Sequence, residues 1–240
     1  MTNKALAARP AAAPPPESRR EAAKAERRAR IVHAARELIS ETGEAGLSMR
    51  ALAARAGVSL ATPYNLFGSK RAVLVTVLED IKGFGKAFAA SSKLPAFERI
   101  LRAVALAISY YEKDPVFSRA LWTSILGSEG AEDRNAIFNP KREAFWLGLL
   151  QEAADAGVLR ADIELTLLLR TLDYAFRATM LHWVIGEIST AELQPAVGYA
   201  YTLALRGAAS AQGLALLEKP LLGFQAKARA RSALTKHAKV

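Results

Sequence analysis

A short segment of the chain carries side chains that suit contact with nucleic acid. Residues 60–66 are expected to form a helix whose outward positions are small or hydrogen-bonding and carry no formal charge: Ser59, Ala61, Thr62, Tyr64 and Asn65. Small side chains allow close approach to a groove, and an asparagine amide can form two hydrogen bonds with adenine. Spacing alone leaves open an ordinary helical hairpin with a solvated face.

Lys70 adds a cation next to this segment. Ser69 is the expected N-cap of a longer helix, residues 70–89, so Lys70 lies at the positive end of its dipole. A cation there is disfavoured by roughly 0.3–1 kcal/mol, whereas a bound phosphate would face both the lysine and the free helix amides. The alternative is a lysine that extends into water.

The elements that position these residues form a helix-turn-helix pattern. Ser48 and Ser59 are the expected N-caps of two short helices, 49–55 and 60–66, and Gly57 lies in the turn between them. Glycine tolerates the left-handed backbone that such a turn requires. A preceding helix ends near Glu41, and its apolar stripe is formed by Ile31, Ala35, Leu38 and Ile39. Leu52, Val58 and Leu66 can close a small core with Leu38 and Ile39.

Residues 31–74 resemble the TetR family of bacterial transcriptional regulators. The resemblance is carried by Ala-Ala-Arg-Ala-Gly-Val-Ser at 53–59 and by Tyr-Asn-Leu-Phe-Gly-Ser-Lys-Arg-Ala-Val-Leu at 64–74. It implies an all-α homodimer, with an N-terminal three-helix DNA-binding domain that contains the helix-turn-helix and a C-terminal helical bundle for effector binding and dimerisation. Pro63 departs from the pattern, because many members have an ordinary helix former there.

The resemblance also implies roles for individual residues. Ser59 to Asn65 would lie on the recognition helix in the major groove of double-stranded DNA. Tyr64 and Lys70 match positions that commonly contact phosphate. Ser48 and Arg50 match a second position that contacts the DNA backbone.

Helical periodicity dominates the rest of the chain. The expected helices span 96–113, 115–126, 139–156, 162–187 and 190–211, with a further piece at 213–228 interrupted by Pro220 and Gly223. The predicted organisation has four parts. A disordered basic arm (1–25) precedes a helix-turn-helix DNA-binding domain (26–90), which is followed by an effector-binding and dimerisation domain (91–228) and a disordered basic tail (229–240).

The last two long helices of the body, 162–187 and 190–211, are the expected dimer interface, as the family resemblance implies. The second is rich in small residues that would let backbones approach closely: Ala191, Ala196, Gly198, Ala200, Ala204, Gly207, Ala208 and Ala209. The alternative is a well-packed pair of helices within one chain.

Aromatic residues gather in the C-terminal part and favour a pocket for a small hydrophobic or aromatic effector. The candidate ligand-binding residues are Tyr110, Tyr111, Trp122, Thr123, Phe145, Trp146, Phe176 and Met180. The alternative is that these are ordinary core residues.

Charge is concentrated at the two ends of the 240-residue chain, whose formal net charge is +10. Residues 1–30 carry +5 and residues 219–240 carry +6, so the body between them carries −1. Either the ends are solvated tails or the first is an arm along nucleic acid.

The sequence offers little to an enzyme. It has no cysteine, and His33, His182 and His237 lie far apart, so no metal or cofactor is expected. Gly83 and Gly85 lack the third glycine of a dinucleotide-binding loop, and Gly68-Ser69-Lys70 lacks the glycine directly before lysine of a P-loop.

A membrane span is not expected either. The most apolar stretch, 165–186, contains Arg170, Asp173, Arg177 and His182, and Asp173 can pair with both arginines on one helix face. The start of the chain lacks a continuous apolar signal segment, so the expected location is the cytoplasm.

These observations predict a sequence-specific DNA-binding transcriptional regulator, expected to be a repressor controlled by a small apolar ligand. A sequence-independent DNA-binding protein driven by the basic ends is one alternative. A small all-α enzyme is the other.

Overall fold

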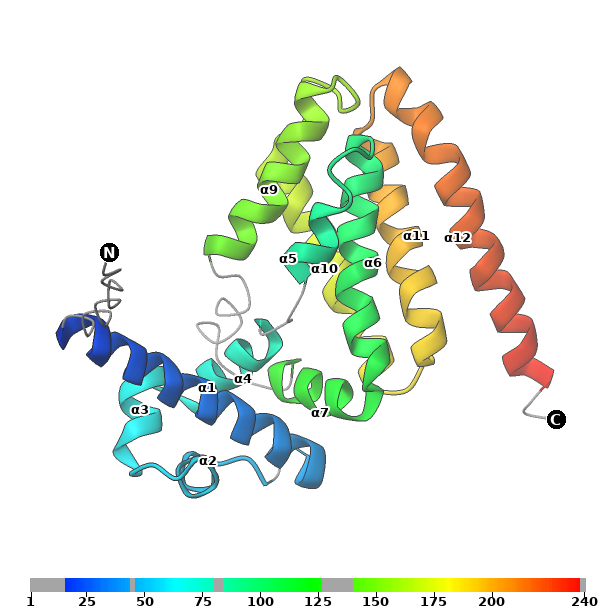
Figure 1. Cartoon of the computed structure of the whole chain (residues 1–240). Coiled ribbons are helices and arrows are strands. Elements are labelled where there is room, and N and C mark those ends of the chain that lie inside the picture. Colours follow the sequence, from blue (N-terminus) through cyan, green and yellow to red (C-terminus); the bar gives the residue numbers. More distant parts are fainter. Residues whose placement is uncertain (1–15, 44–45, 80–83, 127–139, 238–240) are drawn as a thin grey trace, which may run out of the picture.

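The computed structural model describes residues 16–43, 46–79, 84–126 and 140–237. Their regular structure is helical, apart from an isolated bridge between Leu159 and Ala209. Figure 1 shows the helices as a small N-terminal group below a bundle of longer helices. The helices are α1 (Pro16–Thr42), α2 (Met49–Ala56), α3 (Ala61–Phe67), α4 (Lys70–Glu79), α5 (Phe84–Ala89), α6 (Ala96–Lys113), α7 (Pro115–Leu126), α9 (Pro140–Asp155), α10 (Leu165–Val184), α11 (Thr190–Ala208) and α12 (Ala211–His237).

The predicted helix-turn-helix is present as α2 and α3. Ser48 caps α2, since its side chain accepts a hydrogen bond from the Ala51 amide at 3.1 Å. Gly57 ends α2 with φ of 63°, in the left-handed region that glycine tolerates. Leu52 of α2 is fully buried against the apolar stripe of α1, which confirms the small core expected there.

The start of α3 differs from the expectation for Ser59. The residue at the N-cap is Leu60, and its side chain makes no capping bond. The Ser59 hydroxyl instead lies 2.9 Å from that of Thr62. Pro63 is buried in the first turn of α3. Backbone N–H groups in the first turn have no acceptor within the helix, so the lack of an N–H on proline leaves the helix intact.

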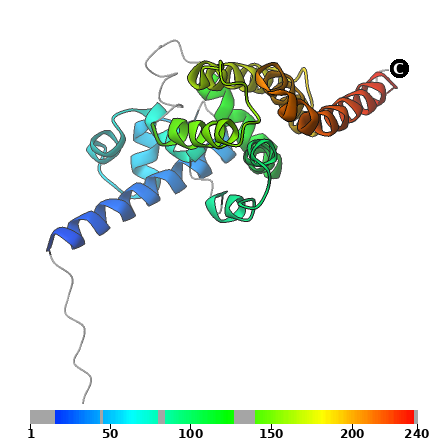
Figure 2. The same cartoon turned by 90° about the horizontal axis from the view of Figure 1, so that it is seen from above.

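The N-terminal arm predicted to be disordered over 1–25 is helical from Pro16 onward. Alanine, glutamate, arginine and lysine fill this segment, and all four are strong helix formers. Because these residues extend a helix whose later part is already packed in the core, they do not have to nucleate a helix of their own. Figure 2 shows this end of α1 extending away from the rest of the molecule. The rest of the predicted arm, 1–15, lies outside the described residues.

The single helix predicted over 70–89 is wrong: the structure has two, α4 and α5. Ser69 caps α4 as expected, through a bond from the Ala72 amide at 3.1 Å. Aromatic packing directs α5 toward α9 instead of along α4. The Phe88 ring centroid lies 5.2 Å from that of Phe145, and Phe84 lies 5.8 Å from the same ring.

The longer helices enclose the main core. Trp122 of α7 and Trp183 of α10 are almost fully buried, as is Met180. Helices α6, α7, α9 and α11 all pack on α10 or on each other around these side chains. The bounds of α6, α7, α9, α10 and α11 follow the sequence expectation closely.

The last helix contradicts two expectations. It runs through Pro220, predicted to interrupt it, and continues to His237, so most of the tail predicted to be disordered over 229–240 is helical. Packing on both sides of the proline stabilises it: Leu217 is fully buried, and Phe224 lies against Gly198 of α11. Residues 238–240 lie outside the described part.

Gly198 therefore serves packing within the chain. A Cβ placed on it would lie 2.4 Å from the Phe224 ring, so only a glycine leaves room for that side chain. This supports, at Gly198, the alternative that small residues of α11 pack against a helix of the same chain. Ala208 and Ala209 are likewise buried, whereas Ala191 and Gly207 are exposed.

Candidate nucleic-acid interface and ligand cavity

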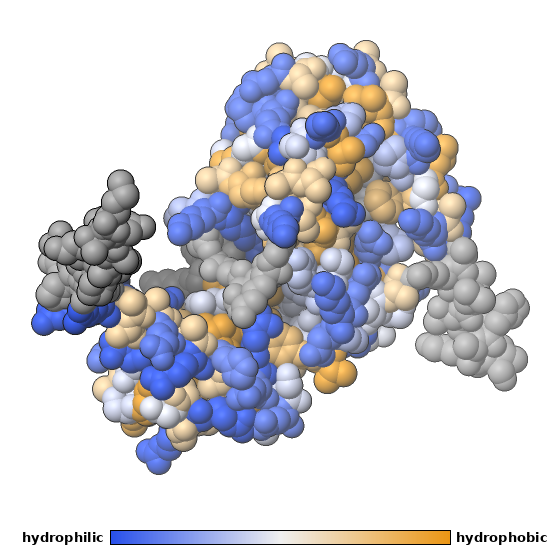
Figure 3. Space-filling model, viewed as in Figure 1, coloured by the Kyte–Doolittle hydropathy of each residue, from blue (hydrophilic) through white to orange (hydrophobic). Residues whose placement is uncertain are grey.

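The outer face of the helix-turn-helix presents most of the residues predicted to bind DNA. Tyr64 is 51% exposed, unusually open for an aromatic side chain. The other exposed members are Ser48, Arg50, Ser59, Ala61 and Asn65, while Thr62 and Lys70 are half-buried. In Figure 3 much of the surface over this end of the molecule is hydrophilic.

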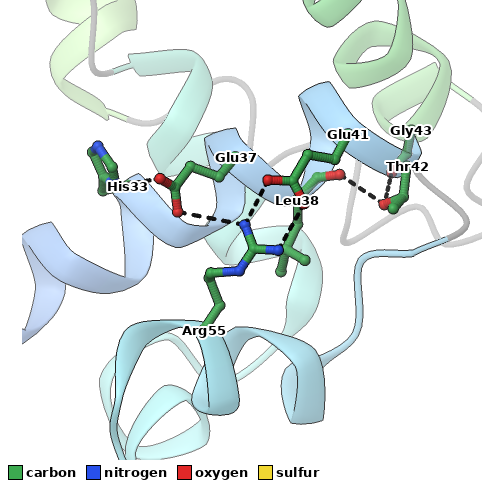
Figure 4. Close-up of polar contacts among 7 residues, drawn as sticks. All are labelled: His33, Glu37, Leu38, Glu41, Thr42, Gly43 and Arg55. Carbon is green, nitrogen blue, oxygen red and sulfur yellow. Dashed lines mark hydrogen bonds and ion pairs between the residues drawn. The ribbon is translucent and has the colours of Figure 1, made fainter.

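An ion-pair cluster fixes α2 against α1 (Figure 4). The Arg55 guanidinium donates hydrogen bonds to both carboxylate oxygens of Glu41, at 2.9 and 2.7 Å, and lies 3.5 Å from Glu37. The hydrogen bond from Arg55 lowers the pKa of the Glu41 carboxyl, and the same bond raises the pKa of Arg55. Two parallel bonds fix orientation as well as distance, so the cluster sets the angle at which α2 presents α3.

Two further arginines of α1 fix the other helices of this end. Arg28 donates to the Leu66 carbonyl at the end of α3, and its guanidinium lies 4.3 Å from the Phe67 ring centroid. Arg36 donates to the Val77 carbonyl of α4 at 3.1 Å and lies 5.5 Å from the Phe117 ring of α7. Because Phe117 belongs to the bundle, Arg36 joins the helix-turn-helix end to the C-terminal part.

The residues predicted to bind ligand do not form one site. Tyr110 and Tyr111 line a groove of about 1020 Å³ bounded by α1, α4, α6 and α7. Trp146 and Phe176 line a separate cavity of about 420 Å³. Neither space is lined by the rest of the predicted set: Trp122, Thr123, Phe145 and Met180.

Packing explains why those four residues line neither space. Trp122 and Met180 are buried in the core, which supports the ordinary core reading for both. Phe145 packs on Phe84 and Phe88. Thr123 is exposed, and its hydroxyl donates to the Arg119 carbonyl one turn earlier.

The smaller cavity lies between α9, α10 and α11 and combines aromatic with charged walls. Trp146 and Tyr201 form one aromatic pair in it, with ring centroids 6.4 Å apart. The full lining is Arg142, Glu143, Trp146, Thr166, Leu169, Arg170, Asp173, Tyr174, Phe176, Arg177 and Tyr201. The three arginines, Tyr174 and Tyr201 were not among the predicted ligand residues. The signal for two of them was the charged series Arg170, Asp173 and Arg177 in an otherwise apolar helix.

Positive and negative charges interact within this cavity. Asp173 pairs with Arg177 at 2.8 Å. Burial raises the pKa of the Asp173 carboxyl, although Arg177 and Arg142 both act to lower it. Burial also raises the pKa of the Tyr201 hydroxyl, against the opposing influence of Arg142. The half-buried Arg142 therefore acts on both groups.

Among the residues that the structure describes, no group of three or more histidine or acidic side chains could hold a metal ion. No helix in the same residues is long and apolar enough to cross a membrane.

Comparison with known proteins agrees with the helix-turn-helix geometry. Residues 31–77 match the model of "Bacterial regulatory proteins, tetR family". The matched segment includes the buried half of α1, all of α2 and α3, and most of α4. No curated protein matches the chain.

Solved structures share the fold of most of the chain. One is FadR of Thermus thermophilus, a TetR family transcriptional repressor crystallised with lauroyl-CoA: TM-score 0.62, 21% identity, covering 75% of this chain and 94% of that one. A TetR regulator from Rhodococcus sp. RHA1 gives a TM-score of 0.58 with 23% identity, and the match covers 76% of this chain and 97% of that one. SmeT, the repressor of the Stenotrophomonas maltophilia multidrug efflux pump SmeDEF, gives a TM-score of 0.56 with 20% identity, and the match covers 77% of this chain and 91% of that one.

The family model matches the segment that forms the helix-turn-helix, and these structures share the all-α arrangement of the N-terminal and C-terminal parts. The helix-turn-helix segment, residues 31–77, therefore matches the tetR family of bacterial regulatory proteins, and about three quarters of the chain shares its fold with solved TetR regulators.

Proposed function

We propose that the protein is a sequence-specific, ligand-controlled repressor of transcription that acts as a homodimer in the cytoplasm. The observation that carries this proposal is the open, uncharged face of α3, held in a fixed orientation by the arginines of α1 and α2. A helix presented in this way suits the major groove, where side chains read base edges.

In this proposal the predicted DNA-binding residues divide into two roles. Ser59, Ala61, Thr62 and Asn65 face the bases, because they are small or can form hydrogen bonds without carrying charge. Tyr64 and Lys70 contact the phosphates that flank the groove, with Ser48 and Arg50 on the backbone at the start of α2. Phosphate contacts fix the register of the protein on DNA, and base contacts supply specificity.

The helical start of α1 adds basic charge to this end of the protein. Its exposed cations are Arg19, Arg20, Lys24, Arg27 and Arg30. Lys24 lies 3.8 Å from Glu21, an exposed pair that contributes little. In our proposal these cations strengthen binding without adding base readout, so their contribution is sensitive to salt.

The homodimer proposal is supported by an apolar stripe on α10. Leu167, Tyr174, Leu181 and Ile185 are 54%, 61%, 45% and 56% exposed, although all are large hydrophobic residues. Their spacing of seven, seven and four residues places them on one face, as in a helix–helix seam. A contiguous apolar face of this kind is typical of an interaction surface, and a second copy of α10 would cover it symmetrically.

Ligand control is supported by the cavity between α9 and α11. Its volume falls in the range typical of small-molecule sites. Thermus thermophilus FadR and Bacillus subtilis FadR, which share this fold, were crystallised with lauroyl-CoA and stearoyl-CoA. A ligand that binds one spacing of the two recognition helices more tightly than another would shift the dimer toward that spacing.

The test is selection of bound sequences from a random duplex pool at about 0.15 M salt, where weak electrostatic binding is partly suppressed. The expected result is enrichment of a palindrome, because a symmetric dimer reads two related half-sites. Binding that follows only charge would favour the sequence-independent alternative. The matched control is the Asn65→Ala variant, which should lose preference at one position of each half-site while it keeps nonspecific affinity.

A further inference from the structure

The cavity between α9, α10 and α11 has a mixed wall that points to one class of ligand. Its apolar members are Trp146, Leu169 and Phe176, with Tyr201 packed on Trp146. Its charged members are Arg142, Arg170 and Arg177 and the acids Glu143 and Asp173. The formal charge of the lining is therefore +1, in a body of the chain that carries −1 between its basic ends.

The charges are also arranged in depth. Asp173 is committed to Arg177 by the 2.8 Å ion pair, and Glu143 is exposed at the surface. Arg142 is half-buried and acts electrostatically on the half-buried Asp173 and on the buried Tyr201. Arg170 is exposed on the α10 side of the opening. An incoming anion would thus meet Arg170 first and Arg142 further in.

We propose that this cavity binds an organic anion, with an apolar body against Trp146 and Phe176 and a carboxylate or phosphate group between Arg142 and Arg170. Guanidinium groups bind both kinds of anion through charge-assisted, often bidentate hydrogen bonds. The proposal names the effector class of the regulator proposed above and in that respect rests on it. It adds an anionic group to the small hydrophobic or aromatic effector expected from the sequence.

The position of Tyr174 connects the cavity with the dimer surface. Tyr174 lines the cavity and is also a member of the exposed apolar stripe of α10. A ligand that displaces its ring alters the surface offered to the second copy. One helix thereby takes part in both ligand binding and dimer geometry, which is the physical requirement for coupling two sites.

The test uses three probes with the same apolar chain: octanoate, octyl phosphate and 1-octanol. Binding to the full-length protein is measured by isothermal titration calorimetry without DNA. At least one anion is expected to bind about tenfold or more tightly than the alcohol, because charge-assisted bonds distinguish them. Preference between octanoate and octyl phosphate identifies the head group. Equal binding of the alcohol, or no binding of either anion at millimolar concentration, would overturn the proposal.

Variants place the anion within the cavity. Arg142→Gln should remove most of the difference between anion and alcohol, and Arg170→Gln should reduce it. Arg170 is exposed, so this second variant remains informative if the first impairs folding. The matched control is Arg102→Gln, an exposed arginine of α6 outside the cavity lining. Anion preference that survives both cavity variants would show that the anion binds elsewhere.

The failure of this proposal can be distinguished from failure of the regulator proposal. If the anion binds at Arg142 but no palindrome is enriched from the duplex pool, the cavity assignment stands and the DNA-binding assignment falls. If a palindrome is enriched but no anion binds, the regulator stands and its effector belongs to another chemical class.

Discussion

The Arg55 guanidinium of α2 and the Glu41 carboxylate of α1 form a two-bond ion pair, at 2.9 and 2.7 Å, across the helix-turn-helix. Neither residue belongs to the face that would contact DNA. Their pairing determines how α2, and therefore α3, is oriented against α1. The interaction is a positioning contact for the recognition helix.

Replacing Arg55 with glutamine should therefore weaken operator binding more than it lowers thermal stability. The pair is exposed to solvent, so its loss should leave the fold intact. Loss of the two parallel bonds should increase amide hydrogen exchange in α2 and decrease DNA affinity. Hydrogen-exchange mass spectrometry and fluorescence anisotropy with the selected operator measure the two effects. Unchanged operator affinity together with faster exchange would contradict the positioning role.

The same pair predicts a pH dependence. The hydrogen bond from Arg55 holds the pKa of the Glu41 carboxyl below its ordinary value of 4.5. Glu41 therefore makes its full contribution to the stability of the folded state above pH 4.5. The contribution falls as the pH drops below 4.5 through the lowered pKa. Stability of the wild type and of Glu41→Gln, measured by urea unfolding, should converge at low pH and differ at neutral pH. A constant difference across this range would show that the ion pair contributes nothing.

Tyr64→Ala should weaken operator binding about fivefold to tenfold, which corresponds to about 1 kcal/mol for one lost hydrogen bond to DNA. Tyr64 is 51% exposed, so its removal should leave thermal stability nearly unchanged. The matched control is Val116→Ala on α7, whose side chain is 75% exposed. Equal anisotropy titrations for the wild type and Tyr64→Ala would exclude Tyr64 from the interface.

Local signals made the helix-turn-helix predictable from the sequence. Ser48 caps the helix that immediately follows it, and Gly57 needs only its own backbone freedom to end that helix. Leu52 falls on the apolar face that the helical period defines. Each of these features acts within a few residues along the chain, which is the range over which a single sequence is informative.

Contacts between distant segments could not be predicted in the same way. Arg142, Arg170 and Tyr201 come from three helices and meet at one cavity only after the bundle has folded. The course of α12 through Pro220 depends on the Gly198–Phe224 contact, because tertiary packing offsets the local cost of the proline. The sequence shows that aromatic residues gather in the C-terminal part. It does not separate core positions such as Trp122 from cavity walls such as Trp146.

Charge on the α10 stripe should separate the proposed dimer. Leu181→Glu places a carboxylate where the two copies of α10 would meet, and burying it without a partner is costly. Sedimentation velocity should show a shift from dimer to monomer at micromolar concentration. Val116→Glu on α7 is the control, since it adds the same charge to an exposed apolar position that is not part of the α10 stripe. A Leu181→Glu protein that sediments as the wild type does would place the dimer interface elsewhere.

Two glycines of α12 should respond to alanine in opposite directions. A Cβ on Gly213 would lie 2.0 Å from the Val158 carbonyl oxygen, a backbone atom that cannot move aside cheaply. Gly213→Ala should therefore destabilise the protein by about 1–3 kcal/mol, the usual cost of overpacking. A Cβ on Gly223 meets nothing within 4 Å, so Gly223→Ala should stabilise α12 by about 0.5–1 kcal/mol through helix propensity. Urea unfolding of the two variants measures both changes. A loss of stability in both would mean that the course of α12 past Pro220 differs from the packing described, whereas opposite signs would support it.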